Sequence, residues 1–246
     1  MFEYLISEKS LGEKMKEVVL PENVDFLFGI KVNPSFYSAL IVTAVLLLVA
    51  VILRIFVIPR FKQVPGKFQA LLEKIVEFFA DLSDSNCAKP NAYLGPYIFS
   101  AGLFIFFGTI IEMVGFPAVM LDINACIAMA LGAFVSIFAV AVKTNKLRGA
   151  GNVLKDFSLP ISMSFRLFGA IMSGGLVLEL VYSFAFLSYG VPVIVYILFT
   201  LLHAVIQLYV YVMLTSIFFG ENTEVKEKAK KKVKNKPTTA QLDHGK

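Results

Sequence analysis

The chain has 246 residues, of which 57% are apolar and 17% are charged. A soluble domain carries roughly 45–50% apolar and about 25% charged residues, so the composition argues against most soluble classes. The apolar residues also cluster, because residues 36–59 and 97–219 are nearly all apolar, whereas 1–35, 60–96 and 220–246 hold most of the charge. Blocks of this length predict an integral membrane protein rather than one or two soluble globular domains.

Residues 36–59 are the first expected transmembrane helix, because 18 uncharged residues precede Arg54. At 1.5 Å per residue, this stretch crosses most of a hydrocarbon core about 30 Å thick. Residues 67–82 differ, since apolar side chains recur there at helical spacing and charged side chains fill much of the rest. That pattern predicts an amphipathic helix that lies on the membrane surface or against the other spans.

Four further apolar stretches follow: about 97–117, 122–142, 160–189 and 193–219. A polar loop is expected over 143–158, and Pro160 suits the first turn of the helix after it. The last two stretches are longer than a perpendicular crossing needs, so we expect them to form a long, tilted hairpin. The sequence therefore predicts an all-α polytopic membrane protein, with five transmembrane helices and one amphipathic surface helix.

The positions of the 23 Lys and Arg residues predict the orientation. They gather in the loops 60–96 and 143–158 and in the tail, while the turns near 118–121 and 186–192 contain none. The positive-inside rule then places both loops and the tail in the cytoplasm. We expect an external N-terminal segment (1–35), a membrane domain (36–219) and a basic cytoplasmic tail (220–246). The tail's basic run also fits an anionic-lipid or nucleic-acid patch, but the positive-inside rule explains it without a nucleic-acid partner.

Ionisable groups inside the expected hydrocarbon region carry the functional information. They are Glu112, Arg166, Glu179 and His203, and Asp122 stands at the external start of the third span. An arginine keeps its proton, so Arg166 cannot relay one, but it can attract a carboxylate and favour the ionised form. Snorkelling to the nearby interface is the alternative role for Arg166.

The surroundings of Arg166 favour close contact with another helix. Gly169, Ala170 and Ser173 share its helix face, and small side chains let helices approach closely, although packing within the chain would use the same strip. Glu179 lies about 140° around the helix and about 20 Å along it, so it cannot pair with Arg166. Glu179 suits the lining of a water-filled cavity.

The last apolar stretch carries a polar stripe: Thr200, His203, Gln207 and Tyr211 recur at intervals of three and four residues. A histidine can exchange protons near neutral pH, while an interhelical hydrogen bond is the alternative for His203. An external-side carboxylate, a titratable histidine and an isolated arginine together suggest an ion path interrupted by a fixed charge.

Two segments resemble subunit a of F-type ATP synthases: PISMSFRLFGAIMSGG (160–175) and HAVIQLYVYVMLTSIFFG (203–220). VPGKFQALLEKIVEFF (64–79) and the stretch from Asp122 are also similar to that family, so the resemblance covers about 60–220. The pair formed by Arg-Leu-Phe-Gly and the glutamine-containing last helix is more specific than either motif alone.

The resemblance implies a non-catalytic stator subunit with two half-channels, which carry H⁺ or Na⁺ to and from a rotating ring of c subunits. It implies that Arg166, Gln207 and Ser173 face the ring, and that Glu179, His203, Glu112 and Asp122 line the half-channels. Arg166 matches the family's essential arginine. The implied partners are the c ring, the b subunits of the peripheral stalk and the lipid bilayer of a bacterial inner membrane. No catalytic residue, metal ion or cofactor is expected.

The chain departs from the family pattern, which usually has Asn at Ala170, often an acid at Gly175, and an acid or His at Thr200. We interpret Glu179 and His203 as channel groups relocated by about one turn, while Asp122 could instead cap its helix. A stand-alone secondary transporter with Glu112, Arg166 and Glu179 as its relay is the alternative function, but no internal repeat supports it. A membrane-embedded hydrolase would need a nucleophile–base pair or a metal cluster, and no HExxH or GxSxG motif is present. The coupling ion stays open.

Overall fold

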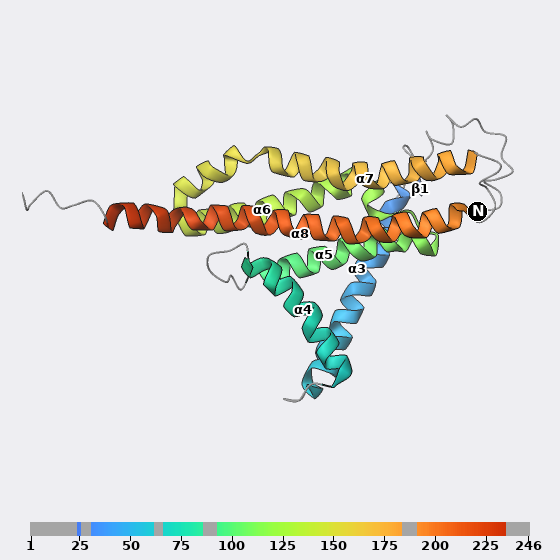
Figure 1. Ribbon diagram of the computed structural model, residues 1–246, viewed down its shortest axis with the longest axis horizontal. Coiled ribbons are helices and arrows are strands. Elements are labelled where there is room, and N and C mark those ends of the chain that lie inside the picture. The colour runs from blue at the N-terminus through green and yellow to red at the C-terminus, as the bar shows by residue number, and fades with distance from the viewer. Residues whose placement is uncertain (1–23, 26–30, 62–65, 86–92, 184–190, 235–246) are drawn as a thin grey trace, which may run out of the picture.

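A computed structural model describes residues 24–25, 31–61, 66–85, 93–183 and 191–234 of the chain. Six main helices make up most of this described part (Figure 1): α3 (Pro34–Ile52), α4 (Lys67–Ser85), α5 (Leu94–Ile110), α6 (Ile123–Lys155), α7 (Ser158–Ser183) and α8 (Val191–Lys234). Short helical turns extend α3 to Arg60 and α5 to Val114, and another covers Val119–Leu121. Before α3, β1 (Val24–Asp25) pairs antiparallel with β2 (Lys31–Val32), a pairing that the sequence pattern did not predict.

The helical architecture confirms the predicted fold class. Within the described residues, five helices are long and apolar enough to cross a membrane: Pro34–Arg60, Leu94–Val114, Ile123–Lys143, Ser158–Val177 and Val193–Asn222. Helix α4 forms where the amphipathic helix was expected and runs three residues further than predicted, to Ser85. Its place on a membrane surface stays a prediction.

The predicted polar loop 143–158 is wrong. Helix α6 continues to Lys155 and α7 begins at Ser158, so only residues 156 and 157 separate the two helices. The polar residues after Lys143 end the apolar block without ending the helix. Lys, Leu, Arg and Ala favour a helix here, but Gly149, Gly151 and two asparagines oppose it, so helix propensity alone does not explain the extension. Val153, near the end of this extension, is 1% exposed, so tertiary packing also holds it. Helix α8 likewise continues beyond residue 219, to Lys234.

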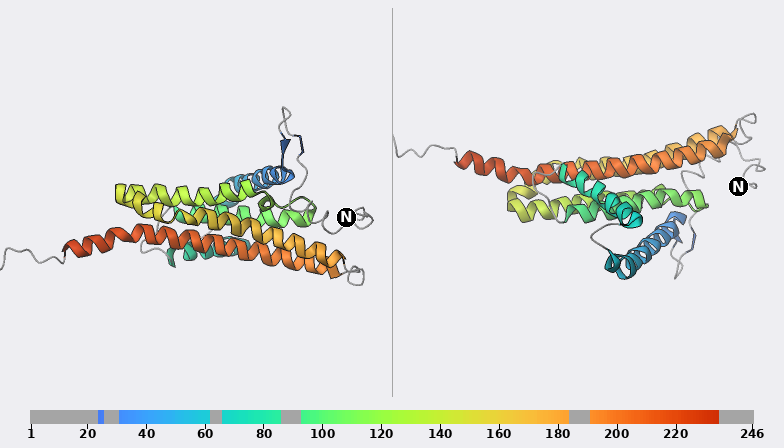
Figure 2. Two further views of the ribbon diagram at one scale, coloured as in Figure 1. Left: turned by 90° about the horizontal axis from the view of Figure 1, so that it is seen from above. Right: turned by 60° about the horizontal axis from the view of Figure 1, so that its bottom comes forward.

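The four helices α5–α8 form the body of the molecule, with α5 packed along α8 and α6 packed against both α7 and α8 (Figure 2). Helices α3 and α4 project from this body (Figure 1), and α3 is exposed along most of its length. Many of the residues buried between the helices are alanines. Small residues are expected here, because helix association in lipid depends on close van der Waals packing.

Two glycines show how close the helices come. A Cβ added to Gly102 of α5 would lie 2.9 Å from Cε1 of Phe79 on α4, and one added to Gly108 would lie 3.2 Å from Cβ of Val119. A larger residue at either position would force the neighbouring element to move. These contacts seat α4 and the Val119–Leu121 turn against α5, and α5 in turn supports one side of α8.

Candidate functional site

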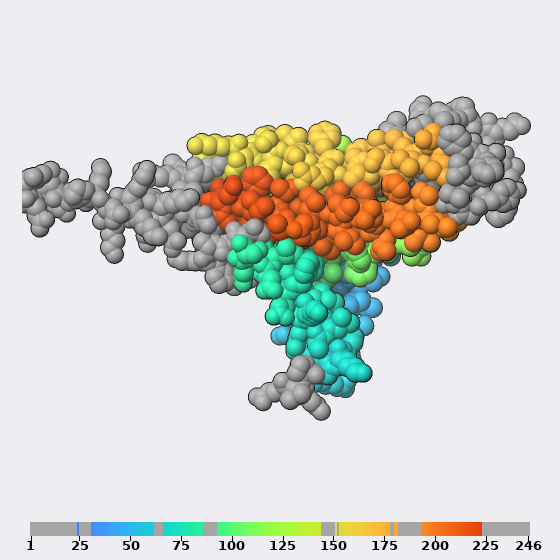
Figure 3. Space-filling model, in the orientation of Figure 1, coloured from blue at the N-terminus to red at the C-terminus, as the bar shows by residue number. Residues whose placement is uncertain are grey.

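Helices α7 and α8 lie side by side across one face of the molecule and carry most of the predicted site residues (Figure 3). The polar stripe of α8 points into the protein, since Thr200 and Gln207 are each 6% exposed and Tyr211 is 2% exposed. This stripe borders two small cavities. Thr200 and His203 line the first, and Gln207 and Tyr211 line the second.

The first cavity has a volume of about 30 Å³ and draws its walls from three parts of the chain. Since one water molecule needs about 10–15 Å³ of such space, the cavity has room for about two water molecules. Its lining includes Thr109, Glu112, Ile171, Gly174, Gly175, Tyr196, Thr200 and His203. The fold thus brings together two of the predicted half-channel residues, Glu112 and His203.

The polar groups of this first cavity are only partly bonded to the protein. The Tyr196 hydroxyl donates to the backbone carbonyl of Glu112 at 2.6 Å, which ties the start of α8 to the end of α5. Nε2 of His203 is buried and has no hydrogen-bond partner within the described part of the chain. Because an unsatisfied buried nitrogen costs about 1–3 kcal/mol, a site that holds water suits this group.

Gly174 and Gly175 give the first cavity a wall without side chains. A Cβ added to Gly174 would meet no atom within 4 Å, so the absence of a side chain there leaves open space. These two glycines lie on α7, opposite the polar residues of α8.

The second cavity is smaller, about 10 Å³, and its lining is largely apolar. It lies among Met163, Arg166, Leu167, Gln207, Val210, Tyr211 and Leu214. Nε2 of Gln207 donates to the backbone carbonyl oxygen of Arg166 across 3.5 Å, near the limit for a hydrogen bond. Gln207 and Arg166 are therefore neighbours in the fold, and the contact runs through the arginine backbone.

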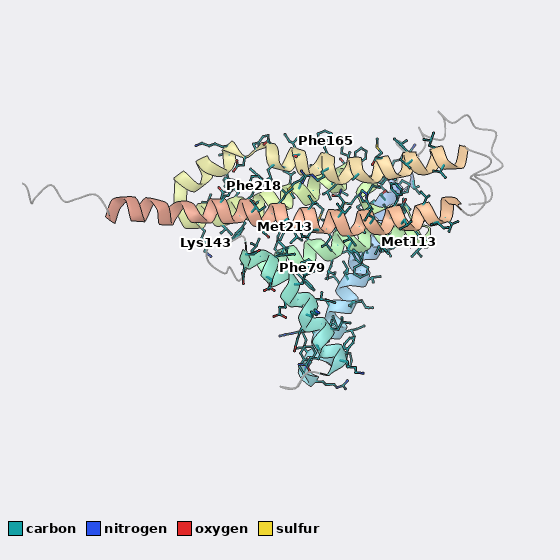
Figure 4. The ribbon with its side chains drawn as sticks, in the orientation of Figure 1. Phe79, Met113, Lys143, Phe165, Met213 and Phe218 are labelled. Carbon is teal, nitrogen blue, oxygen red and sulfur yellow. The ribbon has the colours of Figure 1, made fainter. Side chains whose placement is uncertain are left out.

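The Arg166 side chain belongs to the outer face of α7. Phe165 beside it is 63% exposed and points away from the other helices (Figure 4). Arg166, Gly169 and Ser173 are also exposed, and Ser173 Oγ donates to the carbonyl of Ala170 at 2.8 Å. Among the side chains that the structure describes, none forms an ion pair or a hydrogen bond with the Arg166 guanidinium.

Of the other two predicted half-channel residues, Asp122 is not part of this arrangement. Asp122 caps α6, because its Oδ1 accepts a hydrogen bond from the backbone N–H of Asn124 at 2.9 Å. It is absent from the lining of both cavities. Glu179 lies within the range of α7, but its side chain lies outside the described residues.

Two tyrosine contacts were missed by sequence reasoning. Tyr196 stands seven residues before His203, which is two helical turns, so the α8 stripe could have been extended to include it. Tyr97 of α5 reaches the Tyr211 hydroxyl at 3.0 Å, and no spacing signal links two residues on different helices.

Known proteins match this chain over the region that contains both cavities. The model of a family described as "ATP synthase A chain" matches residues 38–220, a range that includes both cavities. A relative from Bigelowiella natans, "ATP synthase subunit a, chloroplastic", is 31% identical to the chain over 190 residues. The alignment covers 66% of this chain and 76% of that relative.

Proposed function

Because the chain belongs to the ATP synthase A chain family, we propose that it carries H⁺ or Na⁺ through two half-channels to and from a rotating ring of c subunits. This movement couples ion translocation to ATP synthesis or hydrolysis in the complex. The chain is a multi-pass membrane protein and a non-catalytic stator subunit of the Fo sector of an F-type ATP synthase.

The observation that carries the proposal is the exposed position of Arg166 on α7, without a bonding partner for its guanidinium among the described side chains. Placing an arginine at the centre of a membrane helix costs about 2.5–3.5 kcal/mol on insertion scales. A carboxylate supplied by a neighbouring protein offsets that cost and is held in its ionised form. A c-ring carboxylate is the partner that the family membership suggests.

Gly169 supports contact with a neighbouring protein over snorkelling alone. Glycine in a helix costs about 1 kcal/mol relative to alanine, and nothing in the described part of this chain requires glycine here, because an added Cβ would meet no atom within 4 Å. Snorkelling of Arg166 gives no reason for this glycine. A second helix that passes close to α7 does, since it needs a side-chain-free surface.

The two cavities suggest the ion path. Ions enter from the external side through the first cavity, where Glu112 and His203 offer a carboxylate and an imidazole beside space for water. The smaller cavity beside Arg166 has room for at most one water molecule, which hinders a continuous aqueous path along α8. An ion leaves the first cavity for the ring carboxylate, and the fixed charge of Arg166 keeps it from crossing directly. Glu179 and Asp122 stay candidates for the outer part of this path.

We assign the orientation from the charge pattern. In Figure 1 the α6–α7 junction and the carboxyl end of α8 lie at the same end of the body, while the start of α8 lies at the other. The basic residues of 143–158 and those near the carboxyl end of α8 belong to the first of these two ends, so we assign that end to the cytoplasm. The segment 1–35 is then external, 36–219 is the membrane domain and 220–246 is the cytoplasmic tail. A bacterial inner membrane and contact with the b subunits of a peripheral stalk complete the proposal.

Replacement of Arg166 by Ala tests this function. In purified complexes returned to liposomes, R166A should abolish ATP synthesis driven by an imposed ion gradient, while c subunits still co-purify. Arg54→Ala is a control, because Arg54 is also an exposed arginine within a candidate membrane span, but it lies in the helical turn that follows α3, away from α7 and α8. Wild-type synthesis in an assembled R166A complex would contradict the proposal. A chain that purifies without a ring of small subunits would favour the stand-alone transporter.

A further inference from the structure

Tyr211 joins three helices through one buried hydroxyl. Its side chain is 2% exposed, and its hydroxyl donates to the backbone carbonyl of Met129 on α6 at 3.0 Å. The Tyr97 hydroxyl of α5 lies 3.0 Å from the same oxygen. Because a carbonyl can only accept, Tyr211 uses its proton on Met129, and Tyr97 is therefore the donor in the second bond.

This junction lies next to the arginine. Tyr211 is four residues after Gln207, so the two side chains share one face of α8 and are separated by about one turn. Both line the small cavity that Arg166 also borders. The hydroxyl bonds of Tyr211 point to α5 and α6, while the Gln207 amide points to α7.

The contact between Gln207 and Arg166 is sensitive to small rotations of α8. Its donor–acceptor distance is 3.5 Å, already at the long limit for a hydrogen bond. A helix surface atom lies about 5–6 Å from the axis, so a rotation of about 10° moves it by about 1 Å. A rotation that small is enough to break the Gln207 bond to the arginine backbone.

We propose that Tyr211 is a positioning residue for Arg166. By bonding to α5 and α6, its hydroxyl fixes the rotation of α8, which holds the Gln207 amide on the Arg166 carbonyl and sets where the guanidinium leaves α7. A phenylalanine would fill the same space, so the hydroxyl contributes the hydrogen bonds that orient α8 and not the packing volume. This inference rests on the proposed function, in which the position of the Arg166 charge controls coupling.

A double-mutant cycle between Tyr211 and Gln207 tests the inference in the whole complex. Tyr211→Phe keeps the ring and removes the hydroxyl, and Gln207→Leu removes the amide that reaches Arg166. We expect Y211F alone to slow gradient-driven ATP synthesis by about fivefold, at unchanged amounts of assembled complex. In the Q207L background, Y211F should add no further loss, because the contact through which it acts is already absent.

Tyr196→Phe is the matched control. It also removes one hydroxyl that bonds to a backbone carbonyl on another helix, that of Glu112, but it borders the other cavity. Its effect on the rate should multiply with that of Q207L. A merely structural role for Tyr211 would produce the same multiplication, so the cycle separates positioning from packing.

The outcomes are distinguishable. Wild-type rates in Y211F, or effects of Y211F and Q207L that multiply as those of Y196F and Q207L do, would overturn the positioning role. If Y211F does not assemble, the cycle of Tyr97→Phe with Q207L decides in its place, because Y97F leaves the Tyr211–Met129 bond intact. An R166A complex that still couples would instead overturn the proposed function itself.

Discussion

The two cavities along α7 and α8 share one helix pair and one polar stripe, yet they differ in size and chemistry. The first is about 30 Å³, the second about 10 Å³. Gly174 and Gly175 line the first, whereas Met163, Leu167 and Leu214 line the second. The larger cavity therefore goes with glycines on α7 and a wall supplied by Thr109 and Glu112, and the smaller one goes with large apolar side chains.

The change from one cavity to the other takes about one helical turn. His203 lines the larger cavity, and Gln207, four residues further along α8, lines the smaller one. Four residues correspond to about 6 Å along a helix. In the proposed function, an ion comes close to the fixed charge of Arg166 without passing it, and a short transition between the two linings suits that role. The predictions below test whether the regions on the two sides of this transition, the first cavity and the surroundings of Arg166, have different functions.

Among the variants below, the largest effect is expected from Gly169→Leu, which lies close to Arg166 on the exposed face of α7. The new side chain meets open space in this chain, so the subunit should still fold, but it would obstruct a ring that passes beside Arg166. Gradient-driven ATP synthesis should fall by at least about tenfold, which corresponds to about 1.4 kcal/mol in the barrier. Gly151→Leu is the control, because Gly151 is also an exposed helical glycine with nothing within 4 Å of its Cβ position. Equal rates for the two variants would show that no partner packs on Gly169.

In the first cavity, Glu112→Gln should slow ion flux without abolishing coupling. The amide keeps the size of the side chain but cannot take up and release a proton at neutral pH. We expect gradient-driven synthesis and passive flux through the membrane sector to fall together by about tenfold. Glu221→Gln is the control, since Glu221 is exposed near the end of the apolar part of α8 and lines neither cavity. Unchanged flux in E112Q would remove Glu112 from the ion path.

A smaller effect is expected from reducing the space for water. Gly174→Val adds three carbon atoms where a Cβ meets nothing within 4 Å, so the chain should accommodate the valine and lose cavity volume. Flux should fall by about threefold, equivalent to about 0.7 kcal/mol, and Gly174→Ala should fall between valine and wild type. Measured rates that do not follow side-chain size would argue against an aqueous path here.

Sequence patterns predicted the parts of this comparison that depend on a single helix. The spacing of Thr200, His203, Gln207 and Tyr211 predicted their shared face, and the stripe is indeed buried or partly buried. The spacing did not reveal that the stripe divides between two cavities, because that depends on which residues of α5 and α7 lie opposite. Helix ends were the least predictable, since hydropathy marks where a membrane ends and α6 continues as a helix beyond that point.

For the same reason, the sequence did not predict which carboxylate lies in the same cavity as His203. Glu112 and Asp122 both carry a carboxylate and lie ten residues apart in the sequence, and both were predicted to line the half-channels. The structure places Glu112 in the lining of the first cavity, while Asp122 bonds to the start of α6. Tertiary packing separates them, because the sequence allowed either carboxylate to line a cavity and allowed Asp122 to cap a helix instead.

The smallest functional effect is therefore expected at Asp122. Asp122→Ala removes the cap of α6 and should destabilise the protein by about 1 kcal/mol, whereas Asp122→Asn keeps a side-chain oxygen that can accept from the Asn124 N–H. Thermal unfolding of the detergent-solubilised complex should detect the loss in D122A, and ion flux should stay at the wild-type rate in D122N. Because Asn differs from Asp in charge but can cap equally well, slower flux in D122N with unchanged stability would mean that the Asp122 charge takes part in the ion path. Unchanged flux would assign the Asp122 carboxylate to the helix cap and leave Glu112, of these two residues, as the candidate for the ion path.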